Sequence, residues 1–154
     1  PAKATRFAAL VGLADAHDRY EELAADTALD VKYIATAHWM HAGNAKMALT
    51  AGKHVLIEKP FTVNAEQAQE FVALAEANGL VALEAMWTRF LPHIVNIQKI
   101  VASGALGEVR SIIADHTQDL PDDPGHRLNA LELGGGAFTR PWHLSNFVRV
   151  GRSR

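Results

Sequence analysis

The sequence predicts an α/β fold built on a parallel sheet. Three short apolar segments are typical of strands, at 31–35, 55–57 and 80–83. The stretches between them, 42–51 and 64–78, carry apolar residues at helical spacing, and each is followed by a glycine. Strands that alternate with helices of this length form βαβ units, and the strands of such units run parallel.

Apolar residues on these two helices identify the sides that should face the sheet. Asn64 precedes the second helix, and Gln67 stands three residues later, which predicts a capping box. The expected inward residues are Ala45, Ala48 and Leu49 on the first helix and Ala68, Phe71, Val72 and Ala75 on the second. Upstream of the sheet, residues 2–11 predict a helix with Ala4, Phe7, Ala8 and Val11 on one side, and residues 20–23 predict a short helix.

The pattern changes near residue 85, where we place a domain junction. Residues 92–103 predict a helix, and strict alternation over 109–115 predicts a strand with one wet face. The polar segment 116–129 is expected to be a loop, and the triple glycine at 134–136 a turn between sheet elements.

Composition excludes several classes of function. The 154 residues are 49% hydrophobic and 21% charged, which is typical of a globular protein. A formal net charge of −2 gives no electrostatic reason to bind nucleic acid or an anionic membrane. No apolar run approaches the roughly 20 residues of a membrane helix. The sequence has no cysteine, so disulfides are excluded and a cytoplasmic setting is expected.

Polar groups follow each predicted strand, at 35–38, 58–60 and 84–87. The carboxyl ends of parallel strands lie at one edge of a sheet, and ligands bind there. Lys59 is the candidate with the clearest chemistry, because a lysine against a dry sheet can take part in acid–base steps. Pro60 would set the direction in which the chain leaves the strand. The residues alone leave open that Glu58 and Lys59 form only a solvated rim.

Metal chemistry is less favoured by the pattern. His38 and His41 are spaced as a possible metal pair, but no third ligand stands at a familiar distance. Asp122 and Asp123 with His126 could hold a cation, although a solvated loop is the favoured interpretation. The sequence therefore predicts no metal site.

These segments, in this order, resemble the Gfo/Idh/MocA family of oxidoreductases. The resemblance covers residues 3–138, and its matching segments are 33–41, 52–61, 84–92, 104–109 and 134–136. The Met-Trp-Thr-Arg-Phe sequence at 86–90 is most similar to the branch that contains dihydrodiol dehydrogenases and NADP-dependent xylose dehydrogenases.

The resemblance implies that residues 1–85 are the C-terminal part of a Rossmann domain and 86–138 the start of a second α/β domain. That second domain would hold substrate and could join copies of the chain through its open sheet. The implied reaction moves hydride between NADP or NAD, with NADP slightly favoured, and the carbinol carbon of a sugar or cyclic diol. Lys59 would be the catalytic residue. The implied cofactor contacts are Ala35, Thr36, His38, His41, Glu58, Lys59, Trp87 and Arg89.

Two departures from the family pattern put activity in doubt. The sequence lacks the G-x-G-x-x-G loop that cradles a pyrophosphate. Residues 139–154 also depart from the pattern, and we interpret them as an out-of-frame, disordered tail that lacks the catalytic tyrosine of this branch. The alternative function is therefore a non-catalytic fragment or an association module, whose exposed sheet edges would bind other strands.

Overall fold

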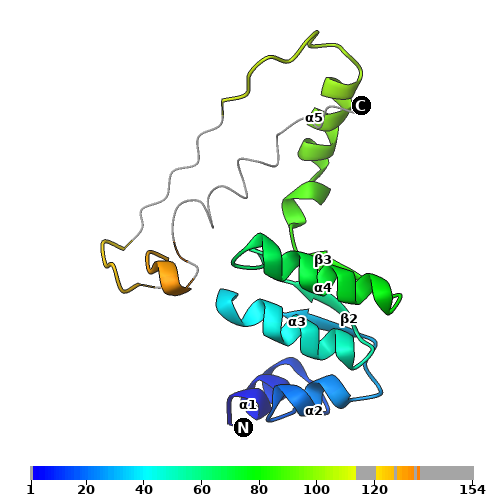
Figure 1. Cartoon of the computed structure of the whole chain (residues 1–154), viewed down its shortest axis with the longest axis vertical. Coiled ribbons are helices and arrows are strands. Elements are labelled where there is room, and N and C mark those ends of the chain that lie inside the picture. Colours follow the sequence, from blue (N-terminus) through cyan, green and yellow to red (C-terminus); the bar gives the residue numbers. More distant parts are fainter. Residues whose placement is uncertain (1, 114–120, 127, 134, 136–154) are drawn as a thin grey trace. The chain divides into compact units, whose positions relative to one another are not determined.

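The computed structural model describes residues 2–113, 121–126, 128–133 and 135. The chain divides into two compact units, Pro1–Glu84 and Ala85–Arg154, which are described separately (Figure 1). In the described part of the chain, no helix is long and apolar enough to cross a membrane.

The first unit contains a parallel three-stranded sheet, as the sequence predicts. Its strands are β1 (Val31–Ile34), β2 (His54–Ile57) and β3 (Ala82–Glu84), in the order β1-β2-β3. The third strand begins two residues later than predicted. Leu80 lies beyond the end of the preceding helix but is still bonded to its last turn, because its N–H donates to the Ala75 carbonyl at 2.8 Å.

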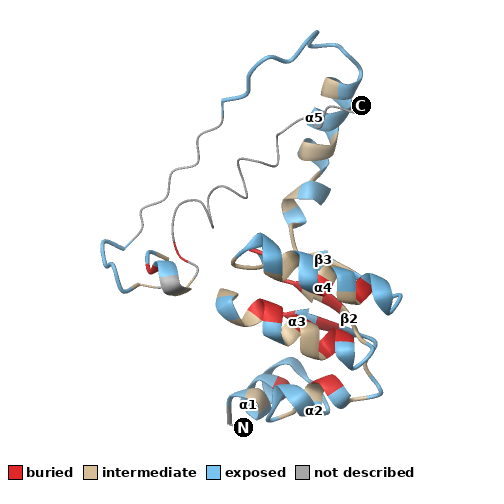
Figure 2. Cartoon of the chain, viewed as in Figure 1, coloured by how far each residue is buried: buried red, intermediate tan, exposed pale blue. Residues whose placement is uncertain are grey.

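Two helices, α3 (His41–Thr50) and α4 (Ala65–Ala77), pack against the sheet and enclose the core (Figure 2). The core cluster of the sheet comes from these helices and strands, namely Ile34, Ala42, Ala45, Ala48, Leu49, Val55, Ile57, Phe71 and Ala75. The predicted inward positions are confirmed, although Ala68 and Val72 are only half-buried. Phe71 is completely buried, and a side chain of this size stabilises the fold by about 1.5–3 kcal/mol on burial.

Helix α4 has the predicted boundaries. The Asn64 Oδ1 accepts the Gln67 N–H at 2.9 Å, which satisfies one of the unpaired donors of the first turn. After the helix, Gly79 adopts a φ of 66°, a left-handed conformation that residues with a Cβ rarely adopt. The cap and the glycine explain why the helix starts and stops where the sequence indicates.

Helices α1 (Ala2–Val11) and α2 (Tyr20–Ala25) confirm the two helices predicted upstream of the sheet. The predicted inward side of α1 is wrong in part. Ala8 is buried, but Phe7 and Val11 are 60% and 50% exposed. An apolar stripe becomes a buried face only where a neighbouring element packs on it.

The second unit contains the short helix η2 (Trp87–Phe90), the helix α5 (Pro92–Ala102) and the single turn η3 (Leu131–Leu133). Helix α5 is confirmed, with Pro92 in its first turn. The strand predicted at 109–115 is wrong for 109–113, which form no strand. A strand needs a hydrogen-bonded partner, and no described segment pairs with these residues. Residues 114–115, residues 116–120 and 127 of the predicted loop, Gly134 and Gly136 of the predicted turn, and the whole 139–154 tail lie outside the described residues.

Candidate functional site

The carboxyl ends of the three strands lie at one edge of the sheet, as predicted. Ile34 pairs with Ile57, and Ile57 pairs with Glu84, so these residues form one row across the sheet. The pairing of β1 with β2 continues one step further, because the Glu58 N–H donates to the Ile34 carbonyl at 2.9 Å. The segments that follow the strands therefore begin side by side.

Lys59 stands on the loop that follows β2, and its side chain is exposed. The loop contains a cis peptide bond between Lys59 and Pro60. Two hydrogen bonds tie it to other elements. The Pro60 carbonyl lies 2.8 Å from Nδ1 of His41, and the Phe61 N–H donates to Oε1 of Glu84 at 2.9 Å. Lys59 thus extends from a backbone that is held from both α3 and β3.

His41 is completely buried at the first turn of α3, next to the short helix η1 (His38–Met40). Its Nδ1 faces the Pro60 carbonyl, and its Nε2 lies 3.1 Å from the Thr36 carbonyl. The His38 ring stands edge-on to it, with ring centroids 5.6 Å apart. His41 therefore joins the segment after β1 to the loop after β2, and its ring is not accessible to a ligand.

The possible metal sites gain no support from the geometry. Both ring nitrogens of His41 face backbone carbonyls, and the ring is completely buried, so neither nitrogen is open to a metal ion. Among the described residues, no group of three or more histidine, aspartate or glutamate side chains is placed to hold a metal ion. Near residue 123, the Asp123 carboxylate accepts the Gly125 N–H at 2.9 Å, which is a turn contact of the kind aspartate often makes.

Glu58 is engaged by two donors at the strand edge. The Tyr33 hydroxyl donates to its Oε1, and the Lys59 backbone N–H donates to its Oε2 at 3.1 Å. The hydrogen bond to the Glu58 carboxylate raises the pKa of Tyr33, so the phenol is kept as a donor. Glu58 therefore links β1 to the start of the Lys59 loop.

The segment after β1 offers small and polar groups. Ala35 is exposed, and Thr36 and His38 are half-buried. The Asn44 side chain donates to the Thr36 hydroxyl at 3.2 Å. Because the Thr36 oxygen is the acceptor in this hydrogen bond, the Thr36 O–H can still donate to another acceptor.

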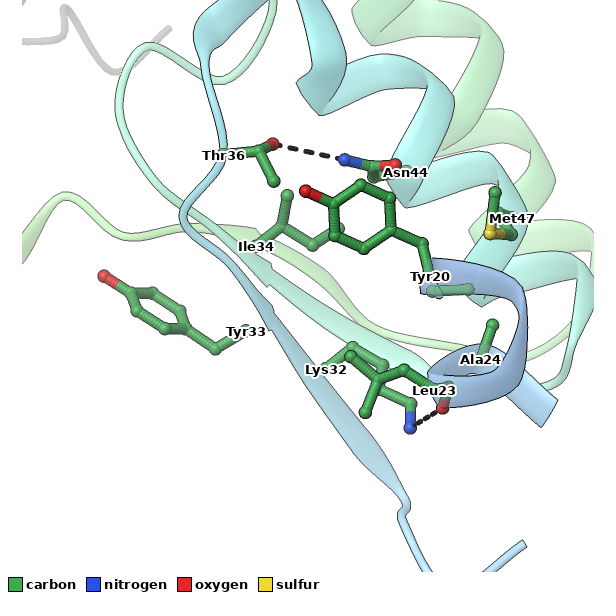
Figure 3. A pocket seen from close by; sticks show the side chains of 10 residues that line it. Tyr20, Leu23, Ala24, Lys32, Tyr33, Ile34, Thr36, Asn44 and Met47 are labelled. Atoms are coloured by element: carbon green, nitrogen blue, oxygen red, sulfur yellow. Dashed lines mark hydrogen bonds between the residues drawn. The ribbon is translucent and has the colours of Figure 1, made fainter. Parts of the chain in front are cut away.

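A mainly apolar pocket lies below this segment, between β1, α2 and α3 (Figure 3). Tyr20, Leu23, Lys32, Thr36 and Asn44 are among its lining residues. At its far end the Lys32 ammonium donates to the Leu23 carbonyl, and burial lowers the pKa of Lys32 against the raising effect of Asp26. The pocket and the predicted cofactor segment share only Thr36, so the pocket is beside the candidate site and does not contain Lys59.

Trp87 and Arg89 belong to η2 in the second unit, where both are exposed. The structure therefore brings together Ala35, Thr36, His38, His41, Glu58 and Lys59 within the first unit. The place of Trp87 and Arg89 in the same site stays a prediction.

Sequence patterns do not identify three residues that support the site: Tyr33, Asn44 and Glu84. Glu84 is visible as a strand-tip residue, but nothing in its spacing indicates a contact with Phe61, which lies 23 positions away. Asn44 follows Thr36 by eight positions, and no rule of helical or strand spacing joins these two. Their roles appear only once the strands are paired.

Comparisons with known proteins agree with the fold and the segment order. The profile of the oxidoreductase family with an NAD-binding Rossmann fold matches residues 1–85. D-xylose 1-dehydrogenase (NADP(+)) of Hypocrea jecorina is 40% identical over 132 residues, covering 80% of this chain and 34% of that enzyme. Trans-1,2-dihydrobenzene-1,2-diol dehydrogenase of Bos taurus is 41% identical over 149 residues, covering 96% of this chain and 44% of that enzyme.

Solved structures show the same relationship. An NAD-binding oxidoreductase from Klebsiella pneumoniae superimposes with a TM-score of 0.65 at 36% identity, covering 70% of this chain and 28% of the other. A 3-ketoreductase from Actinomadura kijaniata in complex with NADP and TDP-benzene has a TM-score of 0.65 at 31% identity, covering 71% and 33%. The chain thus spans less than half the length of these proteins. By its sequence and its fold, it belongs to the Gfo/Idh/MocA family of oxidoreductases.

Proposed function

We propose that this chain carries part of the active site of an NAD(P)-dependent dehydrogenase that acts on a carbinol carbon of a sugar or cyclic diol. The observation that carries the proposal is the strand edge, where exposed Lys59 extends from a loop tied to the two neighbouring elements. Ala35 and Thr36 follow the adjacent strand at the same edge. The relatives that act on xylose and on a dihydrodiol support this substrate class.

Lys59 has the chemistry that this reaction needs. Oxidation of an alcohol builds negative charge on its oxygen, and a nearby ammonium stabilises that charge more in the transition state than in the ground state. Among the described side chains, no carboxylate is paired with the Lys59 ammonium. The Lys59 side chain is therefore available to the substrate oxygen: as an amine it can accept a proton from an alcohol, and as an ammonium it can donate one to a carbonyl oxygen.

The residues present fit one part of a nicotinamide dinucleotide. The cofactor would supply the hydride acceptor or donor. Exposed Ala35 allows close approach, and the Thr36 hydroxyl can donate to a ribose or amide oxygen. These contacts concern the nicotinamide half of the cofactor, because the loop of glycines that cradles a pyrophosphate is not among the residues of this sequence.

NADP is the favoured cofactor. The xylose dehydrogenase relative is named for NADP(+), and the ketoreductase was crystallised with NADP. Trp87 and Arg89 are proposed to help hold the cofactor or substrate, since a guanidinium suits planar oxygen groups. His41 is better assigned to holding the loop than to touching the cofactor, because its ring is buried.

The first test is cofactor binding by the full chain. Trp39 is 47% exposed and follows His38 in the proposed cofactor segment, so bound NADPH should quench its fluorescence. Saturable quenching at micromolar NADPH, with weaker quenching by NADH, is the expected result. No quenching up to millimolar NADPH would reject the cofactor site.

The second test is turnover. Lys59→Ala should abolish the reduction of NADP by D-xylose or a trans-dihydrodiol and leave the circular dichroism spectrum unchanged. Lys53→Ala is the matched control, because Lys53 stands just before β2, at the opposite end of the same strand. Equal turnover in the Lys59 variant and the wild type would remove Lys59 from the mechanism.

The alternative, an association module, is supported by the edge of β1. His54 and Glu58 bond to the carbonyls of Asp30 and Ile34, so even-numbered residues of β1 face β2. The backbone groups of Val31 and Tyr33 then point to the other side, where no described strand pairs with β1. If the chain is an association module, its molecular mass in solution should rise with protein concentration. The mass of the Val31→Lys variant should stay that of a monomer, because a charge on an edge strand blocks pairing with another strand. A monomer that binds NADPH would favour the enzyme.

A further inference from the structure

Glu84, at the end of β3, makes one of the two hydrogen bonds that tie the Lys59 loop to its neighbours. Its Oε1 accepts the N–H of Phe61 at 2.9 Å, and this contact is partly buried. Phe61 is the second residue after Lys59 in the chain. The contact therefore joins the end of one strand to the loop that carries the proposed catalytic lysine.

The Lys59 loop has few polar backbone groups by which it can be held. Pro60 has no N–H, so Phe61 offers the first backbone donor after that of Lys59. The Pro60 carbonyl faces His41, and the Phe61 ring packs on Phe71 with ring centroids 4.6 Å apart. Glu84 therefore accepts the Phe61 N–H, which lies in the chain between exposed Lys59 and the Phe61 ring that packs on Phe71.

The chemistry of the contact makes it strong. A carboxylate that accepts a backbone N–H forms a charge-assisted hydrogen bond, which is about twice as strong as a neutral one. Glu84 is half-buried, and its neighbour on β3, Leu83, points to the opposite side of the sheet. Loss of the carboxylate would leave the Phe61 N–H without an acceptor in a partly buried place.

We propose that Glu84 is a positioning residue for Lys59. By accepting the Phe61 N–H, it fixes the backbone from which the lysine extends, and so the place of the ammonium at the sheet edge. This inference rests on the proposed function in one respect, namely that Lys59 acts on the substrate. The hold on the backbone is independent of that function.

Amide exchange tests the hold on the backbone. In the wild-type chain, the Phe61 amide should exchange at least about tenfold more slowly than an unprotected amide, although it belongs to no helix or strand. Glu84→Ala should raise this exchange rate about tenfold or more, whereas Glu84→Gln keeps an acceptor oxygen and should stay within about threefold. Glu76→Ala, an exposed position on α4, is the control and should change nothing.

Two results would show that Glu84 does not fix the backbone at Phe61. One is a wild-type Phe61 amide that exchanges like an unprotected peptide. The other is an unchanged exchange rate in folded Glu84→Ala. If that variant does not fold, the wild-type rate and the rate in Glu84→Gln still decide the question.

Kinetics test the consequence for Lys59. Glu84→Ala should lower kcat for NADP reduction about 10- to 100-fold, with KM for the cofactor nearly unchanged, and Glu84→Gln should restore most of kcat. An unchanged kcat in the folded Ala variant would contradict the positioning role. A wild-type chain without turnover would contradict the proposed function instead, and the exchange rates would still decide whether Glu84 holds the Phe61 N–H.

Discussion

Replacement of the buried histidine at the start of α3 should destabilise the chain by removing a single donor. His41 is completely buried, and its two ring nitrogens face the carbonyls of Pro60 and Thr36 at 2.8 and 3.1 Å. A neutral imidazole has one N–H, so we count one donated hydrogen bond. The shorter contact, to Pro60, is the buried one, and water cannot easily replace the lost donor there.

The expected magnitude follows from this contact. His41→Leu replaces the ring with an apolar side chain of similar size and leaves the Pro60 carbonyl without a donor. An unsatisfied buried acceptor costs about 1–3 kcal/mol, and the free energy of unfolding should fall by that amount. Urea unfolding followed by circular dichroism measures the change, provided that the urea dependence of the unfolding free energy keeps its slope.

A matched control exists on another helix. His93 is exposed on α5, and His93→Leu should change the free energy of unfolding by less than about 0.5 kcal/mol. If His41→Leu is as mild as this control, then the ring does not hold the Lys59 loop. The assignment of His41 to a supporting role would then be wrong.

Four further predictions follow from the described structure. Phe71→Ala should lower the free energy of unfolding by about 3–5 kcal/mol, whereas exposed Phe7→Ala should change it by less than about 0.5 kcal/mol; urea unfolding compares the two. Asn64→Ala should cost about 1 kcal/mol in the same assay, and Asn64→Asp should retain most of the cap. The Ala28 N–H and then His17 lower the pKa of Asp26 below its ordinary value of 3.8. The Asp26 carboxylate therefore stabilises the fold above pH 3.8, and this contribution is lost as the pH falls through its lower, folded-state pKa. Asp26→Asn should have a lower free energy of unfolding than wild type at neutral pH, and urea unfolding should show this difference shrinking in acid. DNA sequencing across codon 139 should reveal a one-base shift after which the gene encodes the tyrosine expected in this branch of the family, and a gene without such a frame contradicts the out-of-frame interpretation.

The local parts of the fold could be predicted from the sequence. The periodicity of α3 and α4 identified Leu49 and Phe71 as inward residues, because the spacing of apolar side chains along a helix is a local property. The cap at Asn64 was equally visible. Predictions that needed a partner element did less well. Phe7 stays exposed on α1, and the alternating residues 109–113 form no strand.

In the candidate site, too, local features could be predicted from the sequence and contacts between distant residues could not. Lys59 could be placed at the sheet edge from the sequence, because parallel strands bring their carboxyl ends together wherever the chain forms βαβ units. The residues that hold its loop could not, since His41 and Glu84 bind backbone atoms of Pro60 and Phe61. A backbone carbonyl or N–H has the same chemistry at every position, so no residue pattern shows which side chain will meet it. Only the strand register, with Ile57 opposite Glu84, determines that meeting, and a one-residue slip would turn the Glu84 carboxylate to the other face of the sheet.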